Sequence, residues 1–440
     1  MDSIVVAKFG GSSLADAGQF QKVLSIVRSD ERRRFVVVSA PGKSNRYKTK
    51  VTDELIALKL HQYEQNQQVG LASKIRCRYS DIVRELGCSV DFGDDMHFLG
   101  RPTAYSEDYV KSRGEYLNAK IFAVLSGYAF IDAANVIKFG HDGKLDMNAC
   151  REARDMLLSI EGGCVIPGYY GAMPNGDIKT FSRGGSDLTG SIIAAILGAE
   201  LYENWTDVSG FYTADPRVVP TARPIVSMTY EEGGELAYQG ASVLHPEATF
   251  PAEDAGIPIR VLNTNRPEDP GTLIAPDSKL GERSDGPVVG IAARQDFMAI
   301  RLKKALMGPE VGFIHRLTGV LSRHGINIEH MPGGLRTIDC IVERAQVDGK
   351  SGALIAEIEK DCGPVKITTQ YDIALICVVG QRMMSKPGFL ERVSGAVARV
   401  GVSVKMVDQG LEENDIILGV ARDDCAKAMK SIHDEFFGPL

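Results

Sequence analysis

Short runs of apolar, mostly β-branched residues alternate with helical patterns over roughly the first 276 residues of the chain. The runs lie at residues 4–6, 35–38, 164–166, 201–205 and 259–262. After the first run, apolar residues are spaced i, i+3, i+4 and i+7, which is the spacing of one helix face. They are Phe20, Val23, Leu24 and Val27. Such alternation predicts an α/β fold in which helices cover both faces of a mostly parallel sheet.

The loops that leave the carboxyl ends of these runs are where chemistry is expected, because ligands of open α/β sheets bind at that edge. The alternation ends near PDSKLGERSDGP, residues 276–287. Its content of Pro, Gly and charged residues predicts a linker or a surface loop.

An internal repeat lies beyond this linker. The segment GFIHRLTG at residues 312–319 recurs as GFLERVSG at residues 388–395. The match continues in the same register, with Arg323 and Gly325 against Arg399 and Gly401. Duplicated modules explain six identities in one register better than two unrelated α/β pieces do.

Each copy of the repeat follows a strand-like run, at residues 297–302 and 373–379. We therefore expect each copy to consist of a strand, a Gly-Phe loop, a helix, a glycine stop and a second strand. The second strands would lie at residues 326–328 and 402–404. Two such modules are expected to pair their sheets, within a chain or across a dimer.

Composition fits a soluble globular protein of two or three domains, with 440 residues, 44% apolar and 24% charged. The net charge is −7, and no block of like charge forms a nucleic-acid-binding arm. The eight cysteines form no Cys-x-x-Cys pair, so neither a zinc site nor a disulfide framework is indicated. Without a basic leader or an apolar run of membrane-spanning length, a cytoplasmic protein with no membrane partner is expected.

The first glycine-rich motif is KFGGSS at residues 8–13, between the first run and the first helix. Its two glycines allow backbone N–H groups to approach a phosphate. A helix N-terminus capped by Ser12 or Ser13 would favour anions. Lys8, at the strand end, can neutralise a transferring phosphoryl group. A tight turn with a surface lysine is the alternative, and the motif is neither a Walker P-loop nor GxGxxG.

A second glycine-rich helix entry is SRGGSD at residues 182–187, before an apolar helix at residues 188–197. Arg183 can hold a carboxylate in a bidentate fork. Asp187 can accept a hydrogen bond from a substrate amine or from a catalytic lysine. A zwitterionic amino-acid substrate needs this pair of charges, although a capping residue beside a surface arginine would also fit.

A third loop is WTDVSGFYTADPR at residues 205–217. Its acidic, aromatic and arginine side chains could hold the base, ribose and phosphates of a nucleotide, although Asp-Pro and Ser-Gly are also ordinary turn chemistry. Three such loops in one α/β region are much less ordinary than one.

These three motifs, together with GASVLHPEA at residues 240–248, resemble the amino-acid kinase family and its aspartokinases in particular. The resemblance runs from residue 1 to about residue 275, and the C-terminal repeat resembles the tandem ACT domains of aspartokinases. It implies a kinase domain at residues 1–290. Two α+β, ferredoxin-like ACT modules would follow at residues 291–370 and 371–440, with the final segment able to return to the first module.

The resemblance also implies a role for each matching residue. Lys8 matches the phosphate-stabilising lysine, and Asp187 would organise that lysine or the substrate amine. The implied substrate ligands are Ser39, Thr52, Glu115, Arg183, Gly185 and Ser186. The implied nucleotide contacts are Lys8, Gly10, Gly11, Ser12, Thr206, Asp207, Tyr212, Arg217 and Ser242.

Two positions depart from the family pattern. Many aspartokinases carry Lys where this chain has Ser242, so a positive charge near the nucleotide is missing or supplied elsewhere. Lys43, Lys48 and Lys50, in a basic loop, are the candidates to supply it. In the first ACT unit, Glu329 stands where lysine-sensitive relatives usually have Asp, which leaves the effector less defined than the kinase.

The implied reaction is the ATP-dependent phosphorylation of the side-chain carboxylate of L-aspartate to 4-phospho-L-aspartate. This is the first step of lysine, threonine and methionine biosynthesis. Mg²⁺ is expected to be held mainly through the ATP phosphates, with no protein metal ligand. Two alternatives are a glutamate-type carboxylate kinase, against which the ACT repeat argues, and a non-catalytic amino-acid sensor.

The ACT repeat further implies feedback regulation by an amino acid, with lysine as the first candidate and threonine as the second, and self-association as a dimer or tetramer. The expected effector residues are Met307, Phe313, Ile314, Asn327, Ile328 and Glu329. Glu329 would offer a negative charge to a cationic side chain, and the three apolar residues at 307, 313 and 314 would pack on its aliphatic stem. The alternative is that Glu329 is a surface carboxylate and the modules only dimerise.

Overall fold

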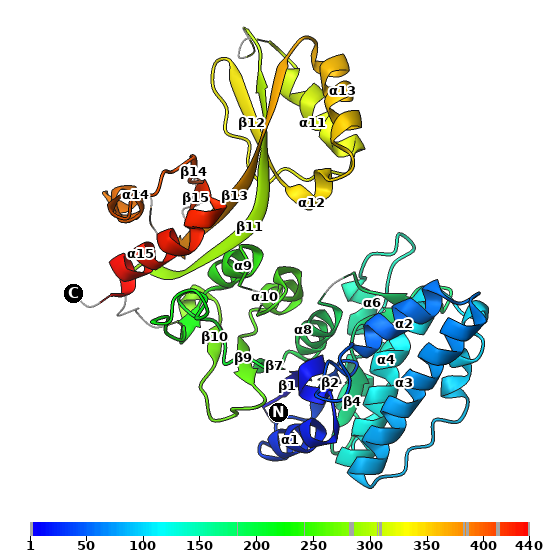
Figure 1. Cartoon of the computed structure of the whole chain (residues 1–440). Coiled ribbons are helices and arrows are strands. Elements are labelled where there is room, and N and C mark those ends of the chain that lie inside the picture. Colours follow the sequence, from blue (N-terminus) through cyan, green and yellow to red (C-terminus); the bar gives the residue numbers. More distant parts are fainter. Residues whose placement is uncertain are drawn as a thin grey trace. The chain divides into compact units, whose positions relative to one another are not determined.

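The computed structural model describes residues 3–182, 184–241, 243–280, 286–305, 307, 310–381, 383, 387–410 and 414–438 (Figure 1). The chain divides into two compact units. The larger unit consists of Met1–Phe211, Pro224–Ala237 and Ser242–Glu282, and the smaller of Tyr212–Arg223, Tyr238–Ala241 and Arg283–Leu440. None of the described helices is long and apolar enough to cross a membrane.

The larger unit is built on an eight-stranded sheet in the order β3-β4-β2-β1-β7-β9-β10-β8. Neighbouring strands run parallel, except β9 and β10, which are antiparallel. The strands are β1 Val5–Phe9, β2 Phe35–Val38, β3 Ala129–Phe130, β4 Cys164–Pro167, β7 Leu201–Thr206, β8 Ser227–Met228, β9 Ile259–Asn263 and β10 Thr272–Ile274. All five apolar runs of the first 276 residues are strands of this sheet, which confirms the predicted α/β architecture.

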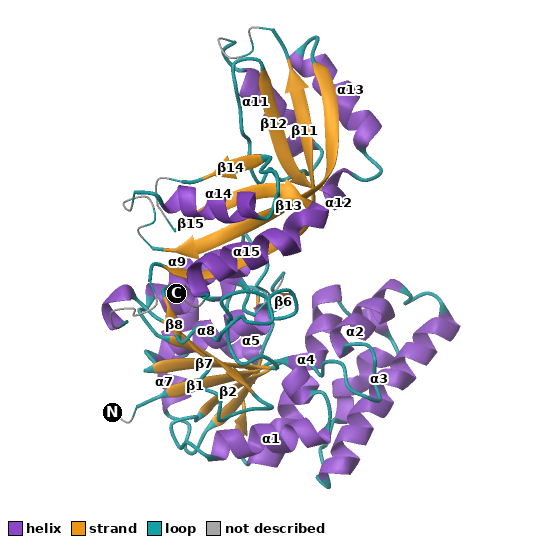
Figure 2. Cartoon of the chain, turned by 60° about the vertical axis from the view of Figure 1, so that its left-hand side comes forward, coloured by secondary structure: helices purple, strands orange, loops and turns teal. Residues whose placement is uncertain are grey.

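Helices cover both faces of this sheet (Figures 1 and 2). One face carries α1 Ala17–Arg28, α2 Val51–Leu60, α3 Gln65–Leu86 and α4 Glu107–Ser126. Their apolar side chains share one core with alternate strand residues such as Phe9, Val38 and Trp205. The other face carries α8 Gly185–Leu197, which packs on β1 and β7, and α10 Phe250–Asp254 beside it.

The remaining elements of the larger unit are short. They are α5 Ala133–Val136, α6 Met147–Arg151, α7 Arg154–Leu158, α9 Tyr230–Tyr238 and a hairpin of β5 Tyr170–Ala172 with β6 Ile178–Thr180. Described 3₁₀ turns lie at Gly11–Leu14, Gly93–Leu99, Pro102–Ala104, Pro246–Ala248 and Asp277–Lys279.

The smaller unit contains an antiparallel five-stranded sheet in the order β12-β11-β13-β15-β14. Its strands are β11 Val288–Lys303, β12 Thr337–Glu343, β13 Lys366–Gly380, β14 Met406–Asp408 and β15 Asp415–Ala421. Its helices are α11 Phe313–Arg323, α12 Arg344–Val347, α13 Ser351–Cys362, α14 Phe389–Arg399 and α15 Cys425–Phe437, with a 3₁₀ turn at Arg422–Asp424. The two copies of the repeat therefore share one continuous sheet.

The two long strands β11 and β13 each contribute to both copies of the repeat. The register between them shifts near their middle, at Arg294 to Phe297. Asp296 and Asp372, at matching positions of the repeat, adopt φ of 71° and 60° there, a conformation that Asp tolerates better than most residues. The apolar core of the first copy contains α11 and α13, and that of the second contains α14 and α15.

The expected module limits at 290/291 and 370/371 fall inside the strands β11 and β13. The first half of β11 pairs with the second half of β13, so it lies in the sheet of the second copy. The final helix α15 packs against α14 in that same copy. No single cut of the chain separates the two copies, and the limits stay predictions.

The glycines at both ends of each repeated helix were expected as turns and have the left-handed backbone that favours glycine. Gly312 and Gly388 precede α11 and α14 with φ of 81° and 86°. The strands expected at residues 326–328 and 402–404 are not formed. Strand pairing begins a few residues later, because the chain after each helix must first reach the edge of the sheet. It begins with an isolated bridge between His330 and Ile341 in the first copy and with β14 in the second.

Candidate active site

A cavity of about 870 Å³ opens at the carboxyl edge of the sheet in the larger unit. Segments that follow β1, β2 and β7 line it, together with the N-terminus of α8. Most of the predicted kinase-site residues lie in its wall. They are Lys8, Gly10, Gly11, Ser12, Ser39, Thr52, Glu115, Gly185, Ser186, Asp187, Thr206 and Asp207. The three glycine-rich or acidic loops of the sequence therefore converge on one cavity.

The loop after β1 is a tight 3₁₀ turn, Gly11–Leu14. The N–H of Gly10 donates to the carbonyl oxygen of Trp205 at 2.9 Å, and the N–H of Gly42 donates to that of Gly11 at 2.7 Å. A Cβ at Gly11 would lie 2.8 Å from the carbonyl oxygen of Ala40, so a side chain does not fit there. Glycine brings the two loops into contact at the edge of the cavity.

The expected cap of the first helix by Ser12 or Ser13 is wrong, because the 3₁₀ turn separates both residues from α1. The Oγ of Ser13 pairs with that of Thr264 at 2.8 Å. Asp16 caps α1 instead, accepting a hydrogen bond from the N–H of Gln19 at 3.1 Å.

The second glycine-rich loop leads into α8. Gly184 has φ of 58°, and a Cβ there would lie 2.6 Å from the Cβ of His245. Both the backbone conformation and the lack of space therefore require glycine at this position. The first residues of α8, Gly185 to Asp187, line the cavity. Unpaired N–H groups and the helix dipole make such an end favourable for anions. Arg183 lies outside the described residues.

Lys8 and Asp187 form an ion pair in the cavity wall. The Lys8 side chain is almost completely buried, and its Nζ also lies 3.4 Å from the Oδ1 of Asn204. The Nδ2 of Asn204 in turn donates to the Oδ1 of Asp187 at 2.9 Å. Asn204 was not predicted as a site residue, although the polar pair Glu203 and Asn204 inside a buried strand was a signal for it.

Glu115, on α4, is a buried carboxyl group in the cavity wall. Burial raises its pKa to about 8, against hydrogen bonding from the backbone of Ala40, which lowers it. Its Oε2 has no hydrogen-bond partner among the residues that the structure describes. A buried carboxyl with an unused oxygen suits a cationic group of a ligand.

The sequence model of the amino acid kinase family matches residues 3–263, and a model of the ACT domain matches residues 376–436. The chain belongs to the amino acid kinase family. Within that family it is one of the aspartokinases, since it is 38% identical to Aspartokinase 3 of Bacillus subtilis over 98% of both chains.

Solved structures agree with this membership. The aspartate kinase of Clostridium acetobutylicum is 42% identical, with a TM-score of 0.88 over 99% of this chain and 100% of that chain. Escherichia coli aspartokinase III in complex with lysine and aspartate is 25% identical, with a TM-score of 0.78 over 99% of both chains.

Ser242, where many aspartokinases carry Lys, lies outside the described residues of this aspartokinase. The basic loop contains the three lysines that were expected to supply the missing charge. Lys43 and Lys50 are exposed and line the cavity, whereas Lys48 is exposed but absent from its lining. The loop rests on Arg78, which is fully buried. The Arg78 guanidinium donates to the carbonyl oxygens of Gly42 and, at 2.8 Å, of Thr49.

Two of the predicted nucleotide contacts, Tyr212 and Arg217, belong to the smaller unit. The Arg217 guanidinium makes three hydrogen bonds to the carboxylate of Asp215, at 2.7, 3.0 and 3.1 Å. Their role toward a nucleotide stays a prediction.

The predicted effector residues of this aspartokinase are placed differently from the cavity residues. Met307 and Phe313 are buried in the core of the first repeat, whereas 53% of the Ile314 surface is exposed. Both side chains belong to the core beneath α11, and their packing on an effector stays a prediction. Ile328 lies at the edge of that core.

Glu329, which was expected to offer a negative charge to an effector, is bonded within the chain. Its carboxylate lies 3.0 Å from the Nη1 of Arg294 and accepts from the Tyr238 hydroxyl at 2.9 Å. The amide of Asn327 lies 3.3 Å away, and only 5% of the Glu329 side chain is exposed. The chain's own arginine thus occupies the position proposed for a cationic effector.

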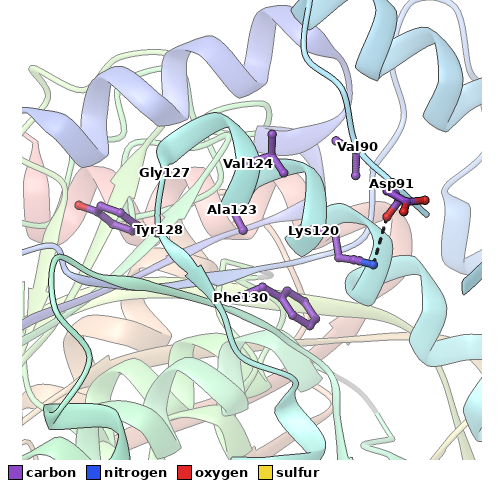
Figure 3. A pocket seen from close by; sticks show the side chains of 8 residues that line it. All are labelled: Val90, Asp91, Lys120, Ala123, Val124, Gly127, Tyr128 and Phe130. Atoms are coloured by element: carbon purple, nitrogen blue, oxygen red, sulfur yellow. Dashed lines mark hydrogen bonds between the residues drawn. The ribbon is translucent and has the colours of Figure 1, made fainter. Parts of the chain in front are cut away.

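A second hollow, of about 460 Å³, lies beside β3 (Figure 3). Its wall is mostly apolar and contains Val124 and Phe130. Lys120 donates to the carbonyl oxygen of Asp91 at 3.3 Å and is ion-paired with Asp95. None of the predicted site residues lines this hollow, and we assign no chemistry to it.

Proposed function

We propose that this aspartokinase transfers the γ-phosphoryl group of ATP to the side-chain carboxylate of L-aspartate, giving 4-phospho-L-aspartate. The observation that carries the proposal is the convergence of the Lys8–Asp187 pair, two glycine-rich turns and the buried Glu115 in one cavity. Two strongly similar relatives are an aspartokinase and an aspartate kinase, and E. coli aspartokinase III binds aspartate.

The reaction needs positioning and charge neutralisation more than proton transfer. The attacking carboxylate is ionised at neutral pH, so no general base is required. The obstacle is the approach of one anion to another, which preorganised positive groups reduce. Lys8, the N–H groups of Gly11 and Ser12, and the first turn of α8 would meet the phosphoryl oxygens.

Aspartate would be held by its charged groups. Glu115 would accept from the α-ammonium, because this carboxyl has an unused oxygen in the cavity wall. Ser39 and Thr52 line the same cavity and would donate to carboxylate oxygens. Arg183 is assigned to a substrate carboxylate by the family resemblance alone.

The nucleotide would contact Thr206 and Asp207 after β7, with its phosphates directed toward Lys8 on β1 and the basic loop after β2. Lys43 and Lys50 would supply the phosphate-binding charge that Ser242 does not. The roles of Tyr212 and Arg217 are carried by the family resemblance.

Mg²⁺ would enter with ATP and shield the charge of its phosphates. In the described part of the chain, no three His, Cys, Asp or Glu side chains are grouped so that they could hold a metal ion. Asp187, the acidic residue nearest Lys8, is already bonded to Lys8 and Asn204. These residues fit an ion bound mainly through nucleotide oxygens.

The ACT repeat would place the enzyme under feedback control by an end product of the pathway that starts with this reaction. Lysine is the first candidate, because E. coli aspartokinase III binds it, and threonine is the second. Binding would inhibit only by favouring an inactive state. Self-association as a dimer or tetramer is part of this proposal.

The test uses the purified full chain with ATP, Mg²⁺, L-aspartate and hydroxylamine. An acyl phosphate traps as aspartyl hydroxamate, so its appearance supports the proposal. Hydroxamate from L-glutamate but not from L-aspartate would instead identify a glutamate-type kinase. Tight aspartate binding without hydroxamate or ADP would identify a non-catalytic sensor.

A further inference from the structure

Asn204 is a polar residue in the interior of a buried strand, and only 1% of its surface is exposed. It lies on β7 directly opposite Lys8 of β1 in the parallel register. The two side chains therefore leave the sheet on the same face, the face that α8 covers with Asp187. Asn204 is absent from the cavity lining, so it contacts the site only through these two residues.

The amide of Asn204 has an acceptor oxygen, which faces Lys8, and a donor nitrogen, which faces Asp187. Its Oδ1 lies 3.4 Å from the Lys8 ammonium, and its Nδ2 donates to the Asp187 carboxylate at 2.9 Å. Turning the amide over would set N–H groups against the ammonium and an oxygen against the carboxylate, both repulsive. The amide thus fits between these two side chains in only one of its two orientations.

This arrangement restricts Lys8 without using up its donors. An ammonium has three N–H donors, and Asp187 and Asn204 accept from two of them. One donor remains for a group in the cavity, which Lys8 lines. A flexible four-carbon side chain loses much of its conformational freedom before any phosphate arrives, which is how preorganisation lowers a barrier.

We propose that Asn204 is a positioning residue for phosphoryl transfer, holding Lys8 and Asp187 in the geometry that presents the ammonium to the transferring group. This inference rests on the proposed kinase activity. Asn204 acts through Lys8 and does not touch either substrate.

The first test is Asn204→Leu, which keeps the side-chain volume and removes both hydrogen bonds. We expect kcat to fall about tenfold to a hundredfold, the loss typical of hydrogen bonds to charged groups. KM for aspartate and for ATP should stay within about twofold, because transition-state positioning is lost and ground-state contacts are kept. Ser191→Ala is the control, because this buried hydroxyl of α8 accepts from the N–H of Ala252 at 2.9 Å and does not line the cavity.

The second test is Asn204→Asp, whose pH dependence separates positioning from simple support of the fold. When the carboxyl group that this substitution introduces is protonated, it can donate to Asp187 and accept from Lys8, as the amide does. When it is ionised, two carboxylates are set against each other. The ratio of kcat in Asn204→Asp to kcat in wild type should therefore rise as pH falls from about 8.5 to about 6.

An active wild type with unchanged kcat in Asn204→Leu, or a flat kcat ratio for Asn204→Asp, overturns this inference and leaves the kinase proposal standing. A wild type that forms no acyl phosphate removes the kinase proposal itself. If Asn204→Leu does not fold, the pH series of Asn204→Asp alone decides the matter.

Discussion

The cavity of the larger unit and the predicted effector residues of the smaller unit contrast in how their charges are used. In the cavity, Glu115 keeps an oxygen without a partner among the described residues, and the lining includes the exposed ammonium groups of Lys43 and Lys50. In the first repeat, Glu329 is bonded to Arg294, Tyr238 and Asn327. Unused bonding capacity in a cavity indicates a ligand, whereas a fully used charge indicates a structural role.

Arg294 illustrates the structural case. Its guanidinium pairs with both Glu329 and Glu343 and lies over the rings of Tyr238 and Phe297, at 5.2 and 4.9 Å. Each of these groups is bonded to, or packed on, another group of the same chain. In the cavity wall, by contrast, the Glu115 carboxyl has an oxygen without a partner among the described residues. The substitutions below should therefore have very different effects in the two regions.

The largest effect is expected for Lys8→Met, which removes the ammonium while keeping the aliphatic stem. Loss of one preorganised charge from a phosphoryl-transfer site costs about 3 kcal/mol or more, so kcat should fall at least about a hundredfold. Initial rates of ADP formation measure it. Lys22→Met, at an exposed lysine of α1 that bonds Asn265, is the control and should be as active as wild type. Near-normal turnover in Lys8→Met would remove the site assignment.

The next effect concerns Glu115 and pH. Burial raises the pKa of this carboxyl to about 8, so below that pH the cavity holds a neutral acid that must lose its proton to pair with the α-ammonium of aspartate. Aspartate binding should therefore strengthen as pH rises from about 6.5 to about 8.5. In Glu115→Gln, KM for aspartate should rise about tenfold and lose this pH dependence. KM measured across pH in both proteins is the test.

The same group gives a stability check with a defined sign. The folded protein holds the Glu115 proton up to about pH 8, whereas the unfolded chain loses it near the ordinary pKa of 4.5. The ligand-free enzyme should thus lose stability as pH rises between these values, and Glu115→Gln should remove this contribution. Unfolding midpoints of the two proteins that run parallel across this range would contradict the assignment of the shift.

A smaller effect is expected in the basic loop. Lys43→Ala and Lys50→Ala should each raise KM for ATP about three- to fivefold, because exposed charges near a phosphate act through a screened field. Lys48→Ala, in the same loop but outside the cavity lining, should change KM by less than about twofold. The effects of Lys43 and Lys50 should shrink at high salt. Equal effects at all three positions would point to the loop's general charge rather than to a phosphate contact.

Much of this fold could be predicted from the sequence because its signals are local. The runs that became β1, β2, β4, β7 and β9 are apolar and bounded by turn residues, and the spacing of the repeat fixed the position of α11 and α14. The sharing of β11 and β13 between both copies could not be predicted. It goes with a register shift between the two strands and with positive φ at Asp296 and Asp372, and neither feature has a signal in the local sequence.

The candidate site divides in the same way. Lys8, Gly11 and Asp187 were found because they lie in short glycine-rich motifs. Asn204 has no motif, and its meaning comes only from lying opposite Lys8 across two strands that are 196 residues apart in the chain. The surroundings of Glu329 could not be predicted either, because sequence patterns give charges and not their partners, and Arg294 is 35 residues away.

The smallest effect on turnover is expected for Glu329→Gln, and this substitution tests the contrast between the two regions most directly. The change removes a carboxylate that Arg294 already neutralises, so the unfolding midpoint should fall, by the equivalent of about 1–3 kcal/mol. The loss should largely disappear in an Arg294→Met background, because the two residues are coupled. Uninhibited kcat should stay within about twofold, since neither residue lines the cavity.

If lysine inhibits the wild type, the lysine concentration for half-inhibition should shift less than about threefold, because a side chain held by Arg294 has no free charge to offer. A shift of about tenfold or more would mean that lysine displaces Arg294 from Glu329. This result would support the effector role predicted from the sequence.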